Sequence, residues 1–202
     1  MKAMTNYEEF IATSRYSRWI EEDNRRETWT ETVDRYMNFF KNHLASEYGV
    51  DHKDEVFKEV RKAILNRDVM PSMRALMSAG PALERSHFAG YNCAFIAVDH
   101  HRAFDEIMFI LMCGTGMGFS VERKHVEQMA PVPNLIIDTA EVIEVADSRE
   151  GWATAYRTLI ENLYSGYMPM WDVSKVRPFG ARLSTFGGRA SGPEPLEQLF
   201  QF

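Results

Sequence analysis

The sequence predicts an α/β protein in which a small helical lobe, residues 1–68, precedes a mixed region, residues 69–202. Apolar residues recur at helical spacing in the first third of the chain, which is typical of amphipathic helices. The middle of the chain then alternates short apolar runs with helical runs, and this alternation favours an α/β arrangement. The glycines and prolines of residues 165–195 predict a long loop with at most one strand.

Three helices are expected in the lobe. The first covers residues 7–22, and the second follows Thr28 and Thr30, a residue type that often caps helices. Asp51 is expected to cap a third helix that runs to about Asn66. Pro71 then ends the helical pattern, because proline disfavours helix at the residue before it. Four apolar residues of the third helix are expected to face inward: Val56, Val60, Ile64 and Leu65.

The mixed region contains two alternations of extended and helical segments. In order, these are a buried strand within residues 91–98, a helix at 103–112, a strand at 119–121 and an extended segment at 135–145. Asp147 or Ser148 is expected to cap a helix that runs to about Tyr164. A further helix starts near Pro195, shortly before the chain ends at Phe202. That ending suggests a split gene product, an interrupted gene or a truncated chain.

Composition argues against several classes of protein. The net charge of −6 disfavours a broad nucleic-acid surface, because binding to phosphates needs clustered Lys and Arg. Apolar runs fall well short of the ~20 residues that span a bilayer, and the acidic N-terminus is unlike a secretion signal. Only two cysteines occur, Cys93 and Cys113, too few for a disulfide-stapled secreted domain. We therefore expect a cytoplasmic protein with reduced thiols and no nucleic-acid or membrane partner.

Residue types give no metal site and two different interpretations for the cysteines. His100 and His101 are adjacent, so they would point apart in a strand, and no cysteine or acid completes a ligand set. Cys113 ends a helix and is interpreted as structural. Cys93 lies in an apolar run, where a cysteine is usually a small buried hydrophobe, but motifs on either side of it favour a functional role.

Five motifs follow one another in a fixed order. They are residues 70–80, with the pattern Pro-Ser-x-Arg-x-Leu-x-x-Ala-Gly; Asn92-Cys93; the glycine-rich residues 114–120; residues 147–152; and residues 185–195. This order resembles ribonucleotide reductases, and the monomeric, adenosylcobalamin-dependent (class II) ribonucleoside-triphosphate branch fits best. Residues 25–29 also resemble that branch. The resemblance covers the chain from about residue 14 onward and corresponds to the N-terminal portion of such an enzyme.

The resemblance implies a fold and a reaction. The fold is a ten-stranded α/β barrel of two antiparallel halves, of which this chain would supply the first part. The reaction converts ribonucleoside triphosphates to 2′-deoxyribonucleotides through a thiyl radical that adenosylcobalamin generates. By position, Cys93 resembles the first member of the reducing cysteine pair. The radical cysteine, the second reducing cysteine and most of the cobalamin site would lie in a further segment or a second chain, and a thioredoxin-type protein would act as reductant.

The resemblance also implies binding residues, each with a simpler alternative. Ser72, Arg74 and Asn92 would contact the ribonucleotide substrate, although Ser72 and Arg74 can equally serve a helix end. Gly114, Gly116 and Gly118 resemble a turn that approaches the base, or form a plain tight turn.

The loop at residues 186–193 resembles one that couples binding of a deoxynucleoside-triphosphate effector to the choice of substrate. The alternative is a static connection. The candidate residues of the loop are Gly187, Gly188, Arg189 and Ser191. A second hypothesis for the whole chain is a non-catalytic nucleotide-binding or regulatory module of the same fold, or a truncated remnant.

Overall fold

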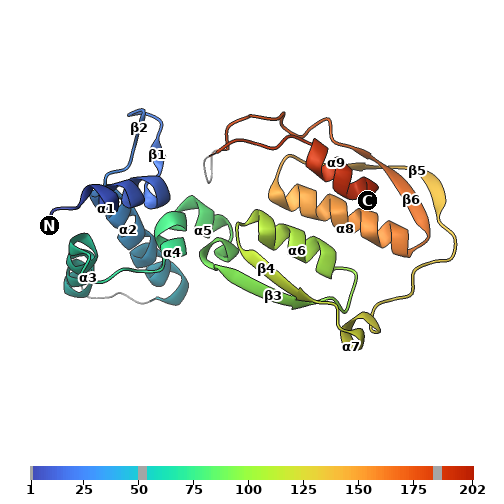
Figure 1. Cartoon of the computed structure of the whole chain (residues 1–202), viewed down its shortest axis with the longest axis horizontal. Helices are drawn as coiled ribbons and strands as arrows, with labels where there is room; N and C mark the ends of the chain where they lie inside the picture. The colour runs from blue at the N-terminus through green and yellow to red at the C-terminus, as the bar shows by residue number, and fades with distance from the viewer. Residues whose placement is uncertain (1, 50–53, 184–187) are drawn as a thin grey trace. The chain divides into compact units, whose positions relative to one another are not determined.

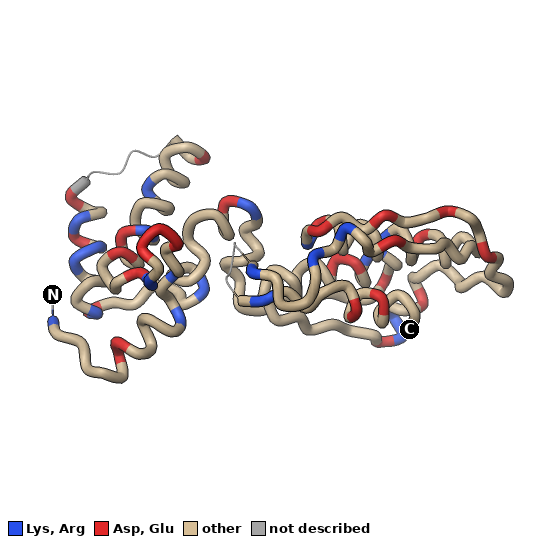
Figure 2. Tube along the Cα trace, turned by 90° about the horizontal axis from the view of Figure 1, so that it is seen from above, with Lys and Arg blue, Asp and Glu red and all other residues tan. Residues whose placement is uncertain are grey.

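The computed structural model describes residues 2–49, 54–183 and 188–202 (Figure 1). Contacts divide the chain into two compact units, the first ending at Gly90 and the second beginning at Tyr91. Because a division by contacts does not by itself define a domain, the predicted boundary after residue 68 stays a prediction. Basic and acidic residues are interspersed along the trace of each unit (Figure 2). None of the helices in the described ranges is long and apolar enough to span a bilayer.

The first unit consists of helices and one short hairpin. Its elements in order are α1 (Asn6–Ile11), the π-helical turn η1 (Ala12–Tyr16), β1 (Trp19–Ile20), β2 (Arg25–Arg26), α2 (Trp29–Tyr48), α3 (Asp54–Asn66), α4 (Met73–Ser78), α5 (Pro81–Arg85) and the 3-10 turn η2 (His87–Gly90). The prediction of one helix over residues 7–22 is wrong beyond Tyr16, because the residues that follow form the antiparallel hairpin β1–β2.

Of the two threonines expected before helix α2, Thr28 is the N-cap. Thr28 Oγ1 accepts a hydrogen bond from the backbone N–H of Glu31, and the Glu31 carboxylate accepts one from the N–H of Thr28. This reciprocal pair is a capping box, which satisfies two otherwise unpaired donors. The helix ends at Gly49, whose φ of 60° is left-handed, a conformation that glycine adopts readily.

Helix α3 buries less apolar surface than predicted. Ile64 is buried and Leu65 packs against the same core, as expected. Val56 and Val60, however, are 51% and 41% exposed, so their predicted inward position is wrong. These two residues lie one turn apart on a single face, whereas Ile64, one turn further along the helix, is packed in the core with Val33 and Met37 of α2. The predicted cap, Asp51, lies outside the described residues.

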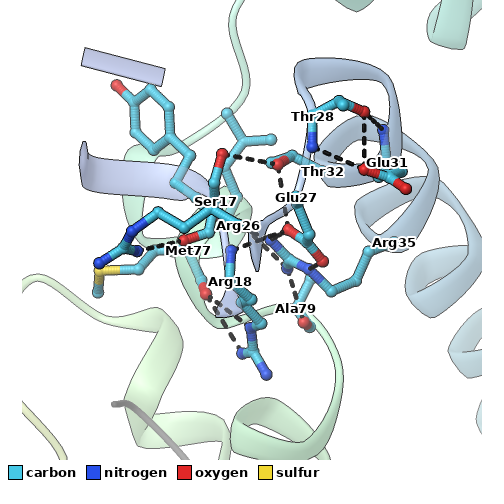
Figure 3. A network of polar contacts seen from close by, with 12 residues as sticks. Ser17, Arg18, Arg26, Glu27, Thr28, Glu31, Thr32, Arg35, Met77 and Ala79 are labelled. Atoms are coloured by element: carbon cyan, nitrogen blue, oxygen red, sulfur yellow. Dashed lines mark hydrogen bonds and ion pairs between the residues drawn. The ribbon is translucent and has the colours of Figure 1, made fainter. Parts of the chain in front are cut away.

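A largely buried ion pair links α2 to η1 and α4 in the first unit (Figure 3). The Arg35 guanidinium donates two hydrogen bonds to the Glu27 carboxylate, at 2.8 and 3.0 Å. It also donates to three backbone carbonyl oxygens near the ends of η1 and α4, those of Tyr16, Leu76 and Ala79. Since helix ends leave carbonyls without intrahelical partners, Arg35 satisfies these groups and holds both ends against α2.

The second unit contains two β–α–β units with parallel strands (Figure 1). The first is β3 (Cys93–Ala97), α6 (Ala103–Met112) and β4 (Gly116–Ser120), and the second is β5 (Ile137–Glu144), α8 (Arg149–Tyr164) and β6 (Tyr167–Asp172). The short α7 (Arg123–Val126) lies between them in sequence, and α9 (Glu194–Gln201) follows β6. The predicted mixed α/β class is confirmed. The described residues form only two-stranded sheets, so the ten-stranded barrel stays a prediction.

Helix α8 is held at its start and along its length. Of the two candidate caps, Ser148 is the N-cap, since its Oγ accepts a hydrogen bond from the N–H of Gly151 at 2.9 Å, whereas Asp147 pairs with Arg177. Along its length, α8 packs against α6, β5, β6 and α9. The core that results contains Ile143, Val145, Ala155, Leu159, Val176, Leu196 and Phe200.

Candidate functional site

The parallel pairing of β3 and β4 fixes the surroundings of Cys93. Cys93 lies beside Gly116, and Phe95 lies beside Gly118. Side chains alternate between the two faces of a strand, so Cys93 and Phe95 share one face. Both are exposed, Phe95 by 69%, while Ala94 and Ile96 on the other face are partly buried. The prediction of a buried strand is therefore wrong for the face that carries the thiol.

The physical reason is that one helix covers one face of a two-stranded sheet. Helix α6 connects β3 to β4 and packs against both strands, and the side chains on the other face of β3, Cys93 and Phe95, are exposed within the part of the chain that the structure describes. An apolar sequence run alone does not distinguish a strand buried on both faces from one buried on a single face.

Backbone hydrogen bonds fix β4 next to Cys93. The N–H of Gly116 donates to the carbonyl oxygen of Asn92 at 2.9 Å. Thr115 is buried, and its Oγ1 donates to the carbonyl oxygen of Tyr91 at 3.0 Å. Both bonds are made by residues just before Cys93, so they fix the start of β3 against β4 next to the thiol. The side chain of Asn92 is exposed at the start of this strand.

The three candidate glycines do not form one turn. Gly114 has a φ of +82° and follows Cys113, the C-cap residue of α6, a position where a left-handed glycine commonly ends a helix. Gly116 and Gly118 lie inside β4, so the prediction that they belong to a glycine turn is wrong. Alternate glycines after a helix are compatible with a turn or with a strand. Only the pairing of β4 with β3 distinguishes the two.

Ser72 and Arg74 belong to the first unit, whereas Asn92, Cys93 and the glycines belong to the second. Ser72 is the N-cap of α4, with its Oγ accepting a hydrogen bond from the N–H of Ala75 at 3.5 Å. Arg74 is partly buried in the first turn of the same helix. The capping alternative for Ser72 is thus present in the structure, and a substrate contact for either residue stays a prediction.

The candidate effector loop is described only in part. Gly187 lies outside the described residues, and Gly188 has a φ of +89°. Arg189 Nη1 donates to the carbonyl oxygen of Gly180 at 3.0 Å. Ser191 Oγ donates to the carbonyl oxygen of Gly192. The Arg189 contact joins the end of the loop to Gly180, whereas the Ser191 contact is local. An effector role for the loop stays a prediction.

The second cysteine has a different environment from the first. Cys113 is 1% exposed at the C-terminal end of α6. Its Sγ accepts a hydrogen bond from Arg149 Nη1 at 3.2 Å. Both cysteines are free thiols. Among the described residues, no group of three or more His, Cys, Asp or Glu side chains is placed to hold a metal ion.

Phe95 is a site residue that the sequence analysis missed. Its ring lies on the same face of β3 as the Cys93 thiol, two residues further along the strand. The signal was present in the sequence, since residues two apart in a strand share a face. An exposed aromatic side chain beside an exposed thiol gives this face an apolar surface suited to packing against another molecule or segment.

Comparison with known proteins gives matches along nearly the whole chain. The family described as "B12-dependent ribonucleotide reductase, insertion domain" matches residues 120–201. The adenosylcobalamin-dependent ribonucleoside-triphosphate reductase of Lactobacillus helveticus is 27% identical, over 92% of this chain and 34% of its own length. The putative reductase of the same description from Mycobacterium phage D29 is 29% identical, over 95% of this chain and 31% of its own length.

A solved structure supports the same fold. The crystal structure of a B12-dependent (class II) ribonucleotide reductase superimposes with a TM-score of 0.80 and 24% identity, over 95% of this chain and 35% of that one. This chain spans about a third of the length of the relatives it matches. The resemblance predicted from the motifs is confirmed: over more than nine-tenths of its length, the chain is similar to about a third of an adenosylcobalamin-dependent, class II ribonucleotide reductase.

Proposed function

We propose that this chain supplies part of the active site of a B12-dependent ribonucleotide reductase that converts ribonucleoside triphosphates to 2′-deoxyribonucleotides. The observation that carries the proposal is the exposed thiol of Cys93 on β3, held beside the bare backbone of Gly116. A thiol on a hydrogen-bonded strand keeps a fixed position, and fixed positions are what a reaction between a side chain and a bound sugar needs.

In this proposal Cys93 is one of two thiols that are oxidised during turnover. Two thiols give a disulfide, and the two protons and two electrons that they release convert the C2′–OH bond of the ribose to C2′–H with loss of water. A thioredoxin-type reductant would then restore both thiols by disulfide exchange. Adenosylcobalamin, when bound, would supply the initiating radical, and we expect residues outside this chain to hold most of it.

The second thiol is expected outside this chain. Cys113 is 1% exposed and accepts a hydrogen bond from Arg149, so it is poorly placed for exchange with a protein reductant. The large exposed apolar side chains of the four strands in the second unit also favour a covering segment or second chain. They include Phe95, Phe119, Ile137, Val142 and Met170.

The remaining residues would bind nucleotides. Ser72, Arg74 and Asn92 are proposed to contact the substrate, with Gly114 allowing close backbone approach. The end of the loop near the chain terminus, at Arg189 and Ser191, is proposed to respond to a deoxynucleoside-triphosphate effector. These assignments depend on the similarity to the class II enzymes.

The test uses this chain together with the polypeptide that completes the reductase. With adenosylcobalamin, a ribonucleoside triphosphate and a thioredoxin system, Cys93→Ser is expected to abolish multiple-turnover formation of deoxynucleotide. Cys113→Ser is the matched control and is expected to retain turnover. Equal turnover by Cys93→Ser and the unchanged protein would eliminate the proposed role of this thiol.

A further inference from the structure

Arg67 occupies a backbone position where glycine is usual. Helix α3 ends at Asn66, and Arg67 follows it with a left-handed φ of 60°. The N–H of Arg67 donates to the carbonyl oxygen of Ile64 at 2.9 Å. The N–H of Asp68, the next residue, donates to that of Ala63, also at 2.9 Å. This pair of hydrogen bonds is a Schellman motif, whose left-handed residue is most often glycine because a side chain is strained there. The arginine therefore needs a reason that the turn itself does not supply.

The Arg67 side chain binds the N-terminal segment, residues 2–8. Its guanidinium donates hydrogen bonds to the carbonyl oxygen of Lys2 at 3.3 Å and to that of Ala3 at 2.9 Å. It also forms an ion pair with the Glu8 carboxylate, with 3.4 Å between Nε and Oε1. The Arg67 side chain is 15% exposed, so these contacts lie largely away from solvent. Glycine would keep the turn and lose all three contacts, which gives a reason for arginine at this position.

The turn at Arg67 sets the direction of the chain toward the substrate candidates. Residues 68–71, a link of four residues, connect Arg67 to Ser72, the N-cap of α4. Within this link Val69 and Met70 are 53% and 50% exposed, so burial contributes little to holding it in place. The path of the link then depends on its two ends, the turn at Arg67 and the start of α4.

We propose that Arg67 is a positioning residue for the segment that carries Ser72 and Arg74, and that residues 2–8 are its anchor. By holding the strained turn in one conformation, the anchor fixes the direction in which the link reaches α4. Sparsely populated backbone conformations persist where the surrounding structure over-determines them, and the contacts with residues 2–8 are that surrounding structure here. The anchoring does not depend on the proposed function, whereas its consequence for substrate binding rests on it.

The first experiment measures hydrogen exchange in the complete 202-residue chain. Arg67→Gly keeps the left-handed turn and removes the side chain. The N–H groups of Ala75 and Leu76 bond to Ser72 in the first turn of α4, and we expect their exchange to accelerate roughly fivefold. The α2 amides report the stability of the core that α2 shares with α4, and they should keep their original rates.

Lys2→Ala is the matched control. It removes an exposed ion pair with Asp68 at the same junction but leaves in place the Lys2 carbonyl oxygen that Arg67 contacts, so exchange in α4 should not change. The inference is overturned by unchanged α4 exchange in Arg67→Gly, by equal acceleration in Lys2→Ala, or by equal acceleration along α2. If the glycine variant unfolds, Arg67→Asn decides, because asparagine also adopts the left-handed conformation.

A second measurement separates this inference from the proposed function. In the reductase completed by its remaining polypeptide, Arg67→Gly is expected to raise the KM for a ribonucleoside triphosphate roughly fivefold with kcat nearly unchanged, as for a loss of uniform substrate binding. A fall in kcat alone would indicate loss of folded enzyme and overturn the positioning role. Faster α4 exchange with KM and kcat both unchanged would keep the anchoring and reject Ser72 and Arg74 as substrate contacts, which is a failure of the proposed function alone.

Discussion

Replacing Glu27 by alanine removes the only carboxylate that the Arg35 guanidinium contacts among the described residues. The two side chains are 10% and 15% exposed, so solvent does little to replace the lost partner. Thr32 Oγ1 and the backbone N–H of Arg18 lose their acceptor as well. Breaking a buried ion pair by removing one partner typically costs about 3–5 kcal/mol, and we expect a loss near the lower value because Arg35 keeps its three carbonyl acceptors.

The pH dependence gives a second measure of the same pair. Burial alone would raise the pKa of Glu27, but hydrogen bonds from the Arg35 side chain and the Arg18 backbone outweigh it, and the pKa is lowered overall. A carboxylate with a lowered folded-state pKa stabilises the protein above its unfolded-state pKa, and this stabilisation is lost as the pH falls through the folded-state value. The unchanged protein should therefore lose more stability on acidification than Glu27→Gln.

The assay is hydrogen exchange of the α2 and α4 amides, which reports the first unit separately from the second. Asp23→Ala is the control, because the Asp23 side chain is 50% exposed in its pair with Arg25; such a surface pair contributes within about 1 kcal/mol. A loss of less than about 1 kcal/mol for Glu27→Ala, similar to most surface substitutions, would refute the reasoning.

Two further substitutions test the second unit. Arg157→Ala leaves the Asp105 carboxylate, 2% exposed, without the guanidinium that binds it at 2.7 Å. Because Arg157 itself is 36% exposed, we expect the free energy of unfolding in urea to fall by about 2–3 kcal/mol. An unchanged unfolding midpoint would contradict this expectation. Gly192→Ala places a Cβ 2.9 Å from the backbone nitrogen of Phe179 at a φ of +75°, so a strain of about 1–3 kcal/mol is expected. Faster hydrogen exchange at the Gly180 amide, which donates to the carbonyl oxygen of Ala190 nearby, would reveal this strain. The control Gly188→Ala has open space around its α-carbon and should show only the smaller cost of its own positive φ.

Local patterns were sufficient where the determinants lie within one helix. The helix predicted at residues 103–112 matches α6, and the N-caps Thr28 and Ser148 begin α2 and α8. Apolar spacing and capping act over three or four residues, so a single segment contains the information. The same spacing misled at residues 17–22, where pairing with β2 replaced the predicted helix.

The sequence by itself determined the α/β class, the alternation of strands and longer helices from β3 to α8, and the motif series that resembles the class II reductases, but it missed the short helices α4, α5 and α7. Only the tertiary structure decided which face of β3 carries an exposed thiol, which glycine stands beside it, and that Glu27 of residues 25–29 is the partner of Arg35. Each of these depends on groups brought together from separate elements, such as Cys93 with Gly116 and Arg35 with Ala79. A one-residue shift in strand register turns every side chain to the opposite face, so such contacts are fixed by the packing of whole elements rather than by local sequence.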